Sequence, residues 1–312
     1  MARKLAWKDL RLLPRYQKQR MVLDNSLRFV FNPGLFSSSL LSVVLPSSEF
    51  YAAADPLASD QYPLLIGQLL LAKGSKSARI ALLAPGELGS EPDYNGLLSH
   101  LSQAACERGA LQLLGEVKVG SHEERILNRA GFRTYAEQRI WKLPRQLMYG
   151  SGQKSWIPAG RADNEPAQKM YQRIVPAQIQ RLEPLPIFPA TQGMISWQEG
   201  RMAGIALTQF GPRGILLDLL LEHSLGSLDE FLSALLFHLP YRSTREVYVR
   251  VRGYQESIAS ALERLGALPG DHQRAVVKRL AVHYNAQQAF LVQGFEKQPD
   301  ITTPISSTEI KN

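Results

Sequence analysis

The sequence predicts a mixed α/β protein that contains two copies of one module, joined head to tail. Its length of 312 residues suits about two domains of ordinary size. Glycines and apolar runs recur at a spacing of about 135 residues, which indicates a duplicated domain rather than a solenoid repeat. Within each copy, strand-like and helix-like segments alternate, as they do in α/β proteins.

The repeat is carried by residues that keep their spacing in both halves. Three glycine pairs recur in one register across a hairpin and the loop after it: Gly67 and Gly204, Gly74 and Gly211, Gly89 and Gly226. After a slip of two residues, a second stretch matches Leu127, Arg129, Gly131, Gln138 and Arg139 with Leu262, Arg264, Gly266, Gln273 and Arg274. One such match could arise by chance, but the ordered series indicates duplication.

Each copy is expected to begin with a helical stretch and a β-hairpin. Gly74 and Gly211 lie between two apolar runs, which is typical of hairpin turns. The strands that follow, 78–84 and 214–221, are apolar almost throughout, as expected of strands covered on both faces.

A helix, a strand, a second helix and a last strand complete each copy. The capping box from Ser227 to Glu230 marks the start of one helix. The expected ranges are 93–108 and 227–239 for the first helix, 111–119 and 246–252 for the strand, and 134–143 and 275–282 for the last strand. A single helical crossover between two strands predicts that they run parallel within a mixed sheet.

This order of elements resembles the module of the GNAT superfamily of N-acetyltransferases. The stretch Arg129-Ala130-Gly131-Phe132, followed by Tyr135 and Arg139-Ile140-Trp141-Lys142, is similar to that family's ending, and Arg264-Leu265-Gly266-Ala267 is a weaker second version. The resemblance covers residues 3–143 and 156–283. It implies two tandem GNAT-like modules, each with a mixed, mostly antiparallel β-sheet and helices on both faces, in a three-layer αβα arrangement.

The module boundaries follow from the repeat. We expect an N-terminal domain at residues 1–144, a linker at 145–156, a C-terminal domain at 157–285 and a polar tail without fixed structure at 297–312. The first copy carries extra residues around 33–62.

The resemblance also implies a cofactor and a reaction. In that family two neighbouring strands part, acetyl-CoA enters the gap, and its pyrophosphate lies at a helix N-terminus. This implies an N-acyltransferase that uses acetyl-CoA or another acyl-CoA and acylates a small-molecule or peptide amine. The candidate cofactor-binding residues are Leu221, His223, Gly226 and Ser227 in the second copy and Leu83, Gly86 and Gly89 in the first. The second copy is favoured, because Glu87 and Glu91 in the first loop repel a pyrophosphate.

The positions of the family's usual catalytic groups are altered in this chain. Leu127 and Leu262 stand where the family often has a tyrosine that protonates the leaving thiolate. The remaining catalytic candidates are Glu123, Glu124 and Tyr254, although the two glutamates are better explained as acids that favour a helix start. These changes leave an alternative, namely a catalytically degenerate GNAT-fold protein that binds a ligand or a partner.

Composition narrows the remaining possibilities. Cys106 is the single cysteine, so neither an intrachain disulfide nor a thiolate zinc site is expected, and no close spacing of His, Asp and Glu suggests another metal site. No apolar run is long enough to span a membrane, and Arg3 and Lys4 are not followed by the apolar core of a signal peptide, so we expect a cytoplasmic protein. The formal net charge of +8 comes mainly from residues 1–20, where a solvated helix face is favoured over a nucleic-acid-binding surface.

Overall fold

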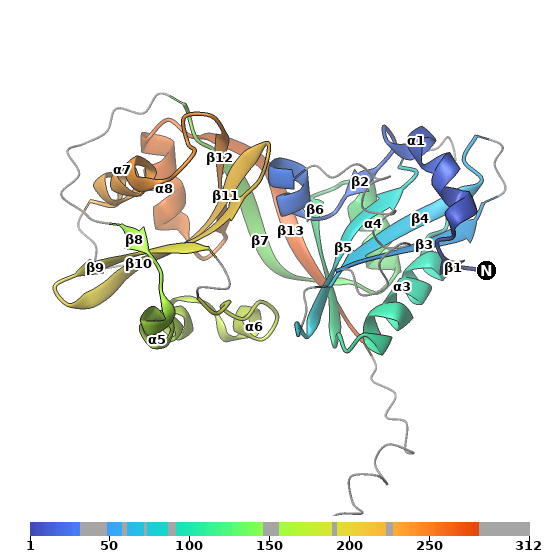
Figure 1. Cartoon of the computed structure of the whole chain (residues 1–312), viewed down its shortest axis with the longest axis horizontal. Coiled ribbons are helices and arrows are strands. Elements are labelled where there is room, and N and C mark those ends of the chain that lie inside the picture. The colour runs from blue at the N-terminus through green and yellow to red at the C-terminus, as the bar shows by residue number, and fades with distance from the viewer. Residues whose placement is uncertain are drawn as a thin grey trace, which may run out of the picture. The chain divides into compact units, whose positions relative to one another are not determined.

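Each half of the chain builds the same succession of strands and helices on a mixed β-sheet (Figure 1). The computed structural model describes residues 1–31, 49–57, 61–71, 74–86, 92–145, 156–188, 192–222 and 227–280. All of these residues belong to one compact unit, Met1–Leu280.

The two halves have matching elements in the same order. The N-terminal half contains β1 (Arg3–Lys4), the 3₁₀ helix η1 (Trp7–Leu12), α1 (Leu13–Tyr16), β2 (Met21–Val22), the π-helical turn η2 (Ser26–Phe31), β3 (Phe50–Pro56), β4 (Leu64–Leu70), β5 (Ser77–Ala84), α3 (Asn95–Glu107), β6 (Gln112–Lys118), α4 (His122–Arg129) and β7 (Arg133–Lys142). The C-terminal half contains β8 (Ile157–Pro158), η3 (Arg161–Asp163), α5 (Asn164–Ile174), α6 (Ala177–Gln180), β9 (Gly193–Gln198), β10 (Arg201–Phe210), β11 (Gly214–Leu221), α7 (Leu228–His238), β12 (Glu246–Arg252), α8 (Glu256–Arg264) and β13 (Leu268–Arg279).

The element order expected of tandem GNAT-like modules is confirmed. The β4–β5 and β10–β11 hairpins are antiparallel, whereas β5–β6 and β11–β12 run parallel. The last strand of the second copy differs from its prediction at 275–282, because β13 begins at Leu268. Residues 268–277 pair with β7 and residues 273–279 pair with β6, so the pairing with β7 carries the strand further towards its N-terminus.

Local sequence signals account for several helix ends. The Ser227 hydroxyl accepts a hydrogen bond from the Glu230 N–H, which confirms the predicted start of α7. Gly131 and Gly266 follow α4 and α8 with φ of 89° and 75°, a conformation that glycine adopts without strain. In both halves the next residue donates its N–H to the helix, Phe132 to Leu127 O and Ala267 to Leu262 O.

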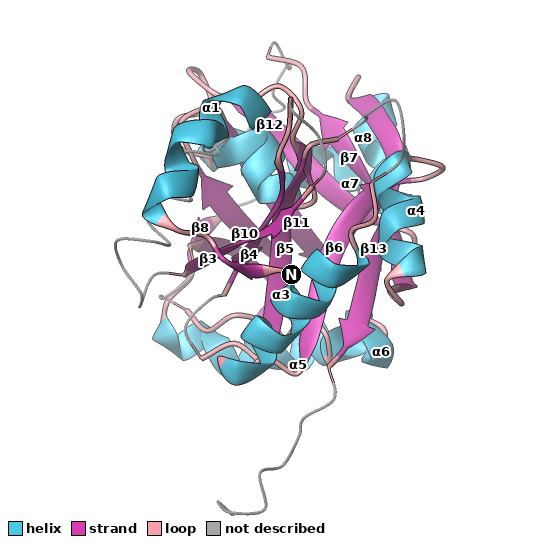
Figure 2. Cartoon of the chain, turned by 90° about the vertical axis from the view of Figure 1, so that its right-hand side faces the viewer, coloured by secondary structure: helices cyan, strands magenta, loops and turns pink. Residues whose placement is uncertain are grey.

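The last strands of the two halves are exchanged. β13 belongs to the C-terminal half, yet it lies between β6 and β7 and pairs antiparallel with both (Figure 2). β7 pairs antiparallel with β12 on its other side. The described strands form one sheet in the order β1-β3-β4-β5-β6-β13-β7-β12-β11-β10-β9-β8, with β2 paired to β5. Each half therefore needs a strand from the other half to complete its part of the sheet.

Helices cover both faces of the sheet in each half (Figure 1). In the N-terminal half, α3 and α4 bury leucines such as Leu97 and Leu127 on one face, and η1 and α1 bury Leu10 and Leu13 on the other. In the C-terminal half, α7 and α8 share one apolar cluster, and α5 and α6 share another on the opposite face. Each fully buried leucine contributes about 1.5–3 kcal/mol of transfer free energy. The predicted three-layer arrangement is therefore confirmed.

A buried polar cluster lies where the two halves meet. Gln138 and Gln273 are equivalent residues of the repeat; they pair across β7 and β13, and the Gln138 side chain donates to the Gln273 side chain at 3.1 Å. Asn25 donates to Gln273 at 2.7 Å, and Gln138 also donates to Glu116 at 3.1 Å. Glu116 in turn forms an ion pair with Arg250 Nη1 at 3.1 Å, and both side chains are buried.

Glu116 and Arg250 are also equivalent positions. Glu116 lies opposite Ala275, two residues beyond Gln273, and Arg250 lies opposite Ile140, two residues beyond Gln138. The duplicated strands thus place opposite charges at matching sites, and the two charges meet at the junction.

Some predicted segments lie outside the described residues. They include most of the linker at 145–156, the tail at 297–312 and part of the extra stretch at 33–62. The domain limits at 1–144 and 157–285 remain a prediction. No helix in the described part of the chain combines the length and apolar character needed to cross a bilayer.

The strand exchange predicts that the halves depend on each other for folding. A fragment of residues 1–145 lacks β13, which leaves unpaired edges on β6 and β7, and a fragment of residues 156–280 lacks β7. We expect neither fragment alone to unfold cooperatively, whereas the two expressed together form a 1:1 complex that does. Circular dichroism melting and size-exclusion chromatography measure this. A monomeric fragment with a cooperative melt would contradict the prediction.

Candidate functional site

The two parallel strand pairs part before their ends, as GNAT-like strands are expected to do. In the N-terminal half, β5 pairs with β6 only from Ser77 to Arg79. In the C-terminal half, β11 pairs with β12 from Gly214 to Asp218 and leaves Leu219 and the residues after it unpaired on that side. Two gaps therefore exist, and their contents differ.

The chain itself fills the gap of the N-terminal half. Met21 and Val22 of β2 pair antiparallel with the parted end of β5. Leu23 then bridges the strands, because its N–H donates to Ala81 O at 3.0 Å and its carbonyl accepts from Glu116 N–H at 2.9 Å. The main-chain groups that a cofactor would use are already hydrogen-bonded within the protein.

The gap of the C-terminal half is spanned by one side chain. The Gln255 amide donates to Leu219 O at 2.6 Å and accepts from Arg252 N–H at 2.9 Å. Gln255 follows β12, at the start of α8, and is buried. A side-chain carboxamide therefore occupies this gap, where the first gap holds a whole strand segment.

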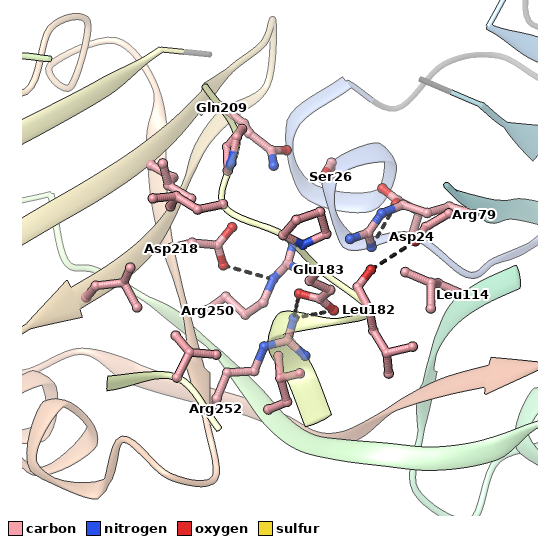
Figure 3. A pocket seen from close by; sticks show the side chains of 18 of the residues that line it. Asp24, Ser26, Arg79, Leu114, Leu182, Glu183, Gln209, Asp218, Arg250 and Arg252 are labelled. Carbon is pink, nitrogen blue, oxygen red and sulfur yellow. Dashed lines mark hydrogen bonds and ion pairs between the residues drawn. The ribbon is translucent and has the colours of Figure 1, made fainter. Parts of the chain in front are cut away.

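A cavity of about 420 Å³ opens at the point where β11 and β12 part (Figure 3). In the C-terminal half, its lining includes Asp218 and Leu219 of β11, Arg250 and Arg252 of β12, and Tyr254 and Gln255 after β12. The segment after α6 supplies apolar residues and Glu183. Residues of the N-terminal half also line it: Asp24, Ser26, Leu27, Phe31, Leu70, Ser75, Ser77, Arg79 and Leu114. Both copies thus form the wall of one cavity.

Charged side chains dominate the polar lining of the cavity. Arg252 binds both oxygens of Glu183, at 2.6 and 2.8 Å, and Glu183 also accepts a short hydrogen bond from Tyr135. Arg250 Nε lies 3.3 Å from Asp218 Oδ1, in addition to its ion pair with Glu116. Such pairs in a buried site interact more strongly than on the surface, because little water screens them.

The surroundings shift the pKa values of three groups in different directions. Burial would raise the pKa of Glu183, but the charges of Arg252, Arg79 and Arg250 outweigh burial and lower it to about 2. Burial raises the pKa of Asp218 above its ordinary range, against the opposing effect of Arg250. Burial also raises the pKa of Tyr254 to about 12, which keeps its hydroxyl protonated at neutral pH. Glu183 is therefore a fixed anion, and Asp218 is the better proton acceptor.

Among the three catalytic candidates predicted from the sequence, only Tyr254 lines the cavity. Glu124 accepts from Gly120 N–H at 2.6 Å and binds Arg274 Nη1 at 2.5 Å. Although burial would raise the pKa of Glu124, these two partners lower it. Glu123 lies beside it in the first turn of α4. Both glutamates occupy positions where acids favour a helix start.

The predicted cofactor residues fall into three groups. In the N-terminal half, Leu83 pairs with Met21, and Gly86 donates its N–H to Gln19 O at 2.5 Å. In the C-terminal half, Leu221 is buried at the end of β11 and Ser227 begins α7. The other three, His223, Gly226 and Gly89, lie outside the described residues.

Sequence reasoning missed the charged residues of the cavity. Arg79 and Asp218 each interrupt an otherwise apolar strand, and Arg250 and Arg252 alternate with valines along β12. A charge within a strand that is covered on both faces needs a buried partner or a ligand. That signal was present in the sequence, but it could not identify the partners. No group of three or more His, Cys, Asp or Glu side chains suited to a metal ion occurs in the described residues.

Comparison with solved structures identifies the fold. A tandem GNAT protein from the clavulanic acid biosynthesis pathway, solved without acetyl-CoA, is 15% identical, and the match covers 90% of this chain and 98% of that one with a TM-score of 0.53. A putative acetyltransferase from Pyrococcus horikoshii is 11% identical over 91% of both chains, with a TM-score of 0.50. A conserved protein of unknown function from Staphylococcus epidermidis is 9% identical over 73% of this chain and 95% of its own, also with a TM-score of 0.50.

These matches show that the chain has the tandem GNAT fold. No protein-family model matches the sequence, and no curated protein sequence matches it. The fold and the cavity together define the class as a tandem GNAT-fold protein with one polar cavity shared by its two copies.

The Glu183 site predicts a specific pH dependence of stability. A carboxyl whose pKa falls from 4.5 to about 2 on folding stabilises the protein above pH 4.5 and loses that effect as the pH falls towards 2. Glu183→Gln also leaves Arg252 without its partner, so we expect a loss of about 3 kcal/mol at pH 7. Urea unfolding at several pH values measures both effects.

A surface pair provides the matched control. Glu165 binds Lys169 on the exposed side of α5, so Glu165→Gln should leave the free energy of unfolding unchanged within error. The prediction fails if the Glu183 and Glu165 variants lose equal stability, or if the acid dependence of the Glu183 variant matches that of the unmodified chain.

Proposed function

We propose that the chain is a GNAT-type N-acyltransferase whose C-terminal copy transfers an acyl group from acyl-CoA to an amine. One observation carries the proposal. In the C-terminal half, β11 and β12 part directly beside a polar cavity, whereas in the N-terminal half the chain fills the equivalent gap. The C-terminal copy therefore has room for an acyl-CoA between its parted strands, whereas in the N-terminal copy the chain itself occupies that place.

The residues of the C-terminal copy fit an acyl-CoA better than those of the first. Main-chain groups from Leu219 to Leu221 would hold the acyl-bearing arm, once Gln255 moves from Leu219 O. The start of α7 would favour a phosphate. Asp229 in that first turn would repel a phosphate, but Arg264 binds it at 2.7 and 2.8 Å and offsets its charge. The parts assigned to His223 and Gly226 remain predictions.

The cavity side chains suit the proton transfers that amide formation needs. An acyl-CoA supplies an activated thioester. The amine must first lose a proton from its ammonium form, and Asp218 is placed to accept it at the mouth of the gap. The nitrogen then bonds to the acyl carbon as the carbon–sulfur bond breaks. Tyr254 keeps its proton at neutral pH and would donate it to the departing thiolate. The second proton, which the nitrogen loses as the amide forms, would restore the Tyr254 hydroxyl.

One observation favours the alternative of a non-catalytic ligand-binding protein. The Gln255 carboxamide bridges the two parted strands in the same way that a bound amide would, and it is buried. If Gln255 never leaves this position, the cavity binds a small molecule but acyl-CoA does not enter.

Cofactor binding separates the two functions. Acetyl-CoA at about a hundred times its Kd should stabilise the folded chain by about 2.7 kcal/mol, which raises the melting temperature. Longer acyl-CoAs serve as a second series. An unchanged melting temperature with every acyl-CoA, for both the unmodified chain and Gln255→Ala, would favour the ligand-binding alternative.

Removal of the proposed base tests the chemistry. We expect Asp218→Asn to bind acyl-CoA as before but to transfer the acyl group about 10²–10⁴-fold more slowly, because the acceptor ammonium keeps its proton. Asp271→Asn removes an exposed carboxylate on β13 that pairs with Lys118, away from the cavity, and should keep full activity. Release of free thiol measures the rate. Equal rates for the two variants would remove Asp218 from the mechanism.

A further inference from the structure

We propose that the cavity binds a small molecule that carries both an oxyanion and an ammonium group, and that Arg79 of the N-terminal copy binds the oxyanion. Asp218 of the C-terminal copy binds the ammonium. The assignment of the ammonium rests on the proposed function, because it is the amine to be acylated. The assignment of the oxyanion rests on the geometry of Arg79 and holds for a ligand-binding protein as well.

Among the described residues that line this cavity, Arg79 is an arginine whose guanidinium makes an ion pair but no hydrogen bond. Its side chain keeps 28% of its surface exposed, and its one ion pair, to Asp24 Oδ2, is 3.7 Å long. That distance is too long for a hydrogen bond, so the five N–H donors of the guanidinium are poorly satisfied. Asp24 is itself engaged, since its Oδ1 accepts from Leu27 N–H at 3.0 Å. Burial raises the pKa of Asp24, against the opposing charge of Arg79.

The other two arginines of the cavity are more fully used. Arg252 uses Nη2 to bind both oxygens of Glu183, and Arg250 is divided between Glu116 and Asp218. Arg250 Nε and Arg252 Nη1 are buried without a hydrogen-bond partner, so each of these arginines can add a single donor, whereas Arg79 offers its whole fork. A planar guanidinium with free N–H groups is well suited to two oxygens of a carboxylate or phosphate. The oxyanion is therefore assigned to Arg79.

The negative end of the site lies across the cavity. Figure 3 shows Asp218 and Arg79 on opposite sides, with Arg250 and Glu183 between them. The Asp218 side chain is 30% exposed, and its contact with Arg250 uses Oδ1 only. A molecule that spans these two residues would match both charges. A cavity of about 420 Å³ is within the range of small-molecule sites.

This assignment gives the N-terminal copy a role in the site of the C-terminal copy. Arg79 comes from β5, the strand equivalent to β11, and its own gap is filled by β2. The position that matches Arg79 in the C-terminal copy is Leu216, because the two lie opposite the equivalent residues Leu114 and Tyr248. Only one copy therefore supplies this charge.

Binding measurements on the full chain, without acyl-CoA, test the proposal. The probes are the common L-amino acids, each compared with its decarboxylated amine and its deaminated acid, and O-phosphoethanolamine as the phosphate counterpart. We expect at least one amino acid or O-phosphoethanolamine to bind, as measured by calorimetry and by a rise in melting temperature. The amine that lacks the oxyanion should bind about 10- to 100-fold more weakly.

Substitution of Arg79 locates the contact. Arg79→Met should weaken binding of the best probe by about 10- to 100-fold but leave binding of its decarboxylated amine unchanged, and Arg79→Lys should recover part of the affinity. Arg125→Met removes an exposed arginine of α4 outside the cavity and should have no effect on the probe. If Arg79→Met does not fold, Arg79→Lys alone decides, because it keeps the charge but loses the planar fork.

These experiments distinguish failure of the Arg79 site from failure of the acyltransferase proposal. Binding of a probe that depends on Arg79, together with no effect of any acyl-CoA, would support this site and reject the acyltransferase. Acyl-CoA turnover of an oxyanion-bearing probe, such as an amino acid, at a rate and KM that Arg79→Met does not change would support the acyltransferase and reject this site. The proposal is also overturned if no probe binds, or if the amines bind as tightly as their parent amino acids.

Discussion

The exchange of β7 and β13 is the constraint on which the rest of the structure depends. Each strand leaves its own half and completes the sheet of the other, so the described strands join in one sheet. A sheet closed in this way leaves no free edge at the junction, where unpaired main-chain groups would otherwise be exposed. Residues of β11 and β12 line one cavity together with residues of β5 and η2, so the cavity is a shared structure.

The junction buries charge, which is costly unless each group is paired. Isolated ions lose several kcal/mol of hydration in such a place, and removal of one partner from a buried pair costs about 3–5 kcal/mol. Here Glu116 accepts hydrogen bonds from the Asn25 main-chain N–H and the Gln138 side chain, and Arg250 neutralises it. The side chains of Asn25 and Gln138 also donate to Gln273. These contacts connect the lining of the cavity to the junction. The charges at the site are therefore held in place by the same residues that join the two copies.

The sequence predicted the elements well and their partners poorly. Periodic apolar runs, the Ser227 cap and the glycines after α4 and α8 depend on neighbours in the chain, so they are readable locally. The sequence does not reveal the strand exchange, because the alternation of inward and outward side chains along β13 is the same whichever half of the chain it pairs with. The filling of the first gap by β2 was missed for a related reason, since Met21 and Val22 are too short a run to predict a strand. Of the cavity residues, Tyr254 was identified from its place before α8, whereas Glu183 carried no local signal in its loop.

The opposite charges at Glu116 and Arg250 have a consequence for how the duplication can evolve. Two N-terminal copies brought together in the same geometry would face each other with two carboxylates, and two C-terminal copies with two guanidinium groups. Like charges in a buried contact disfavour both assemblies, so each copy is complementary only to the other kind. The two equivalent positions carry opposite charges, so an assembly of two identical copies would need a compensating substitution at one of them.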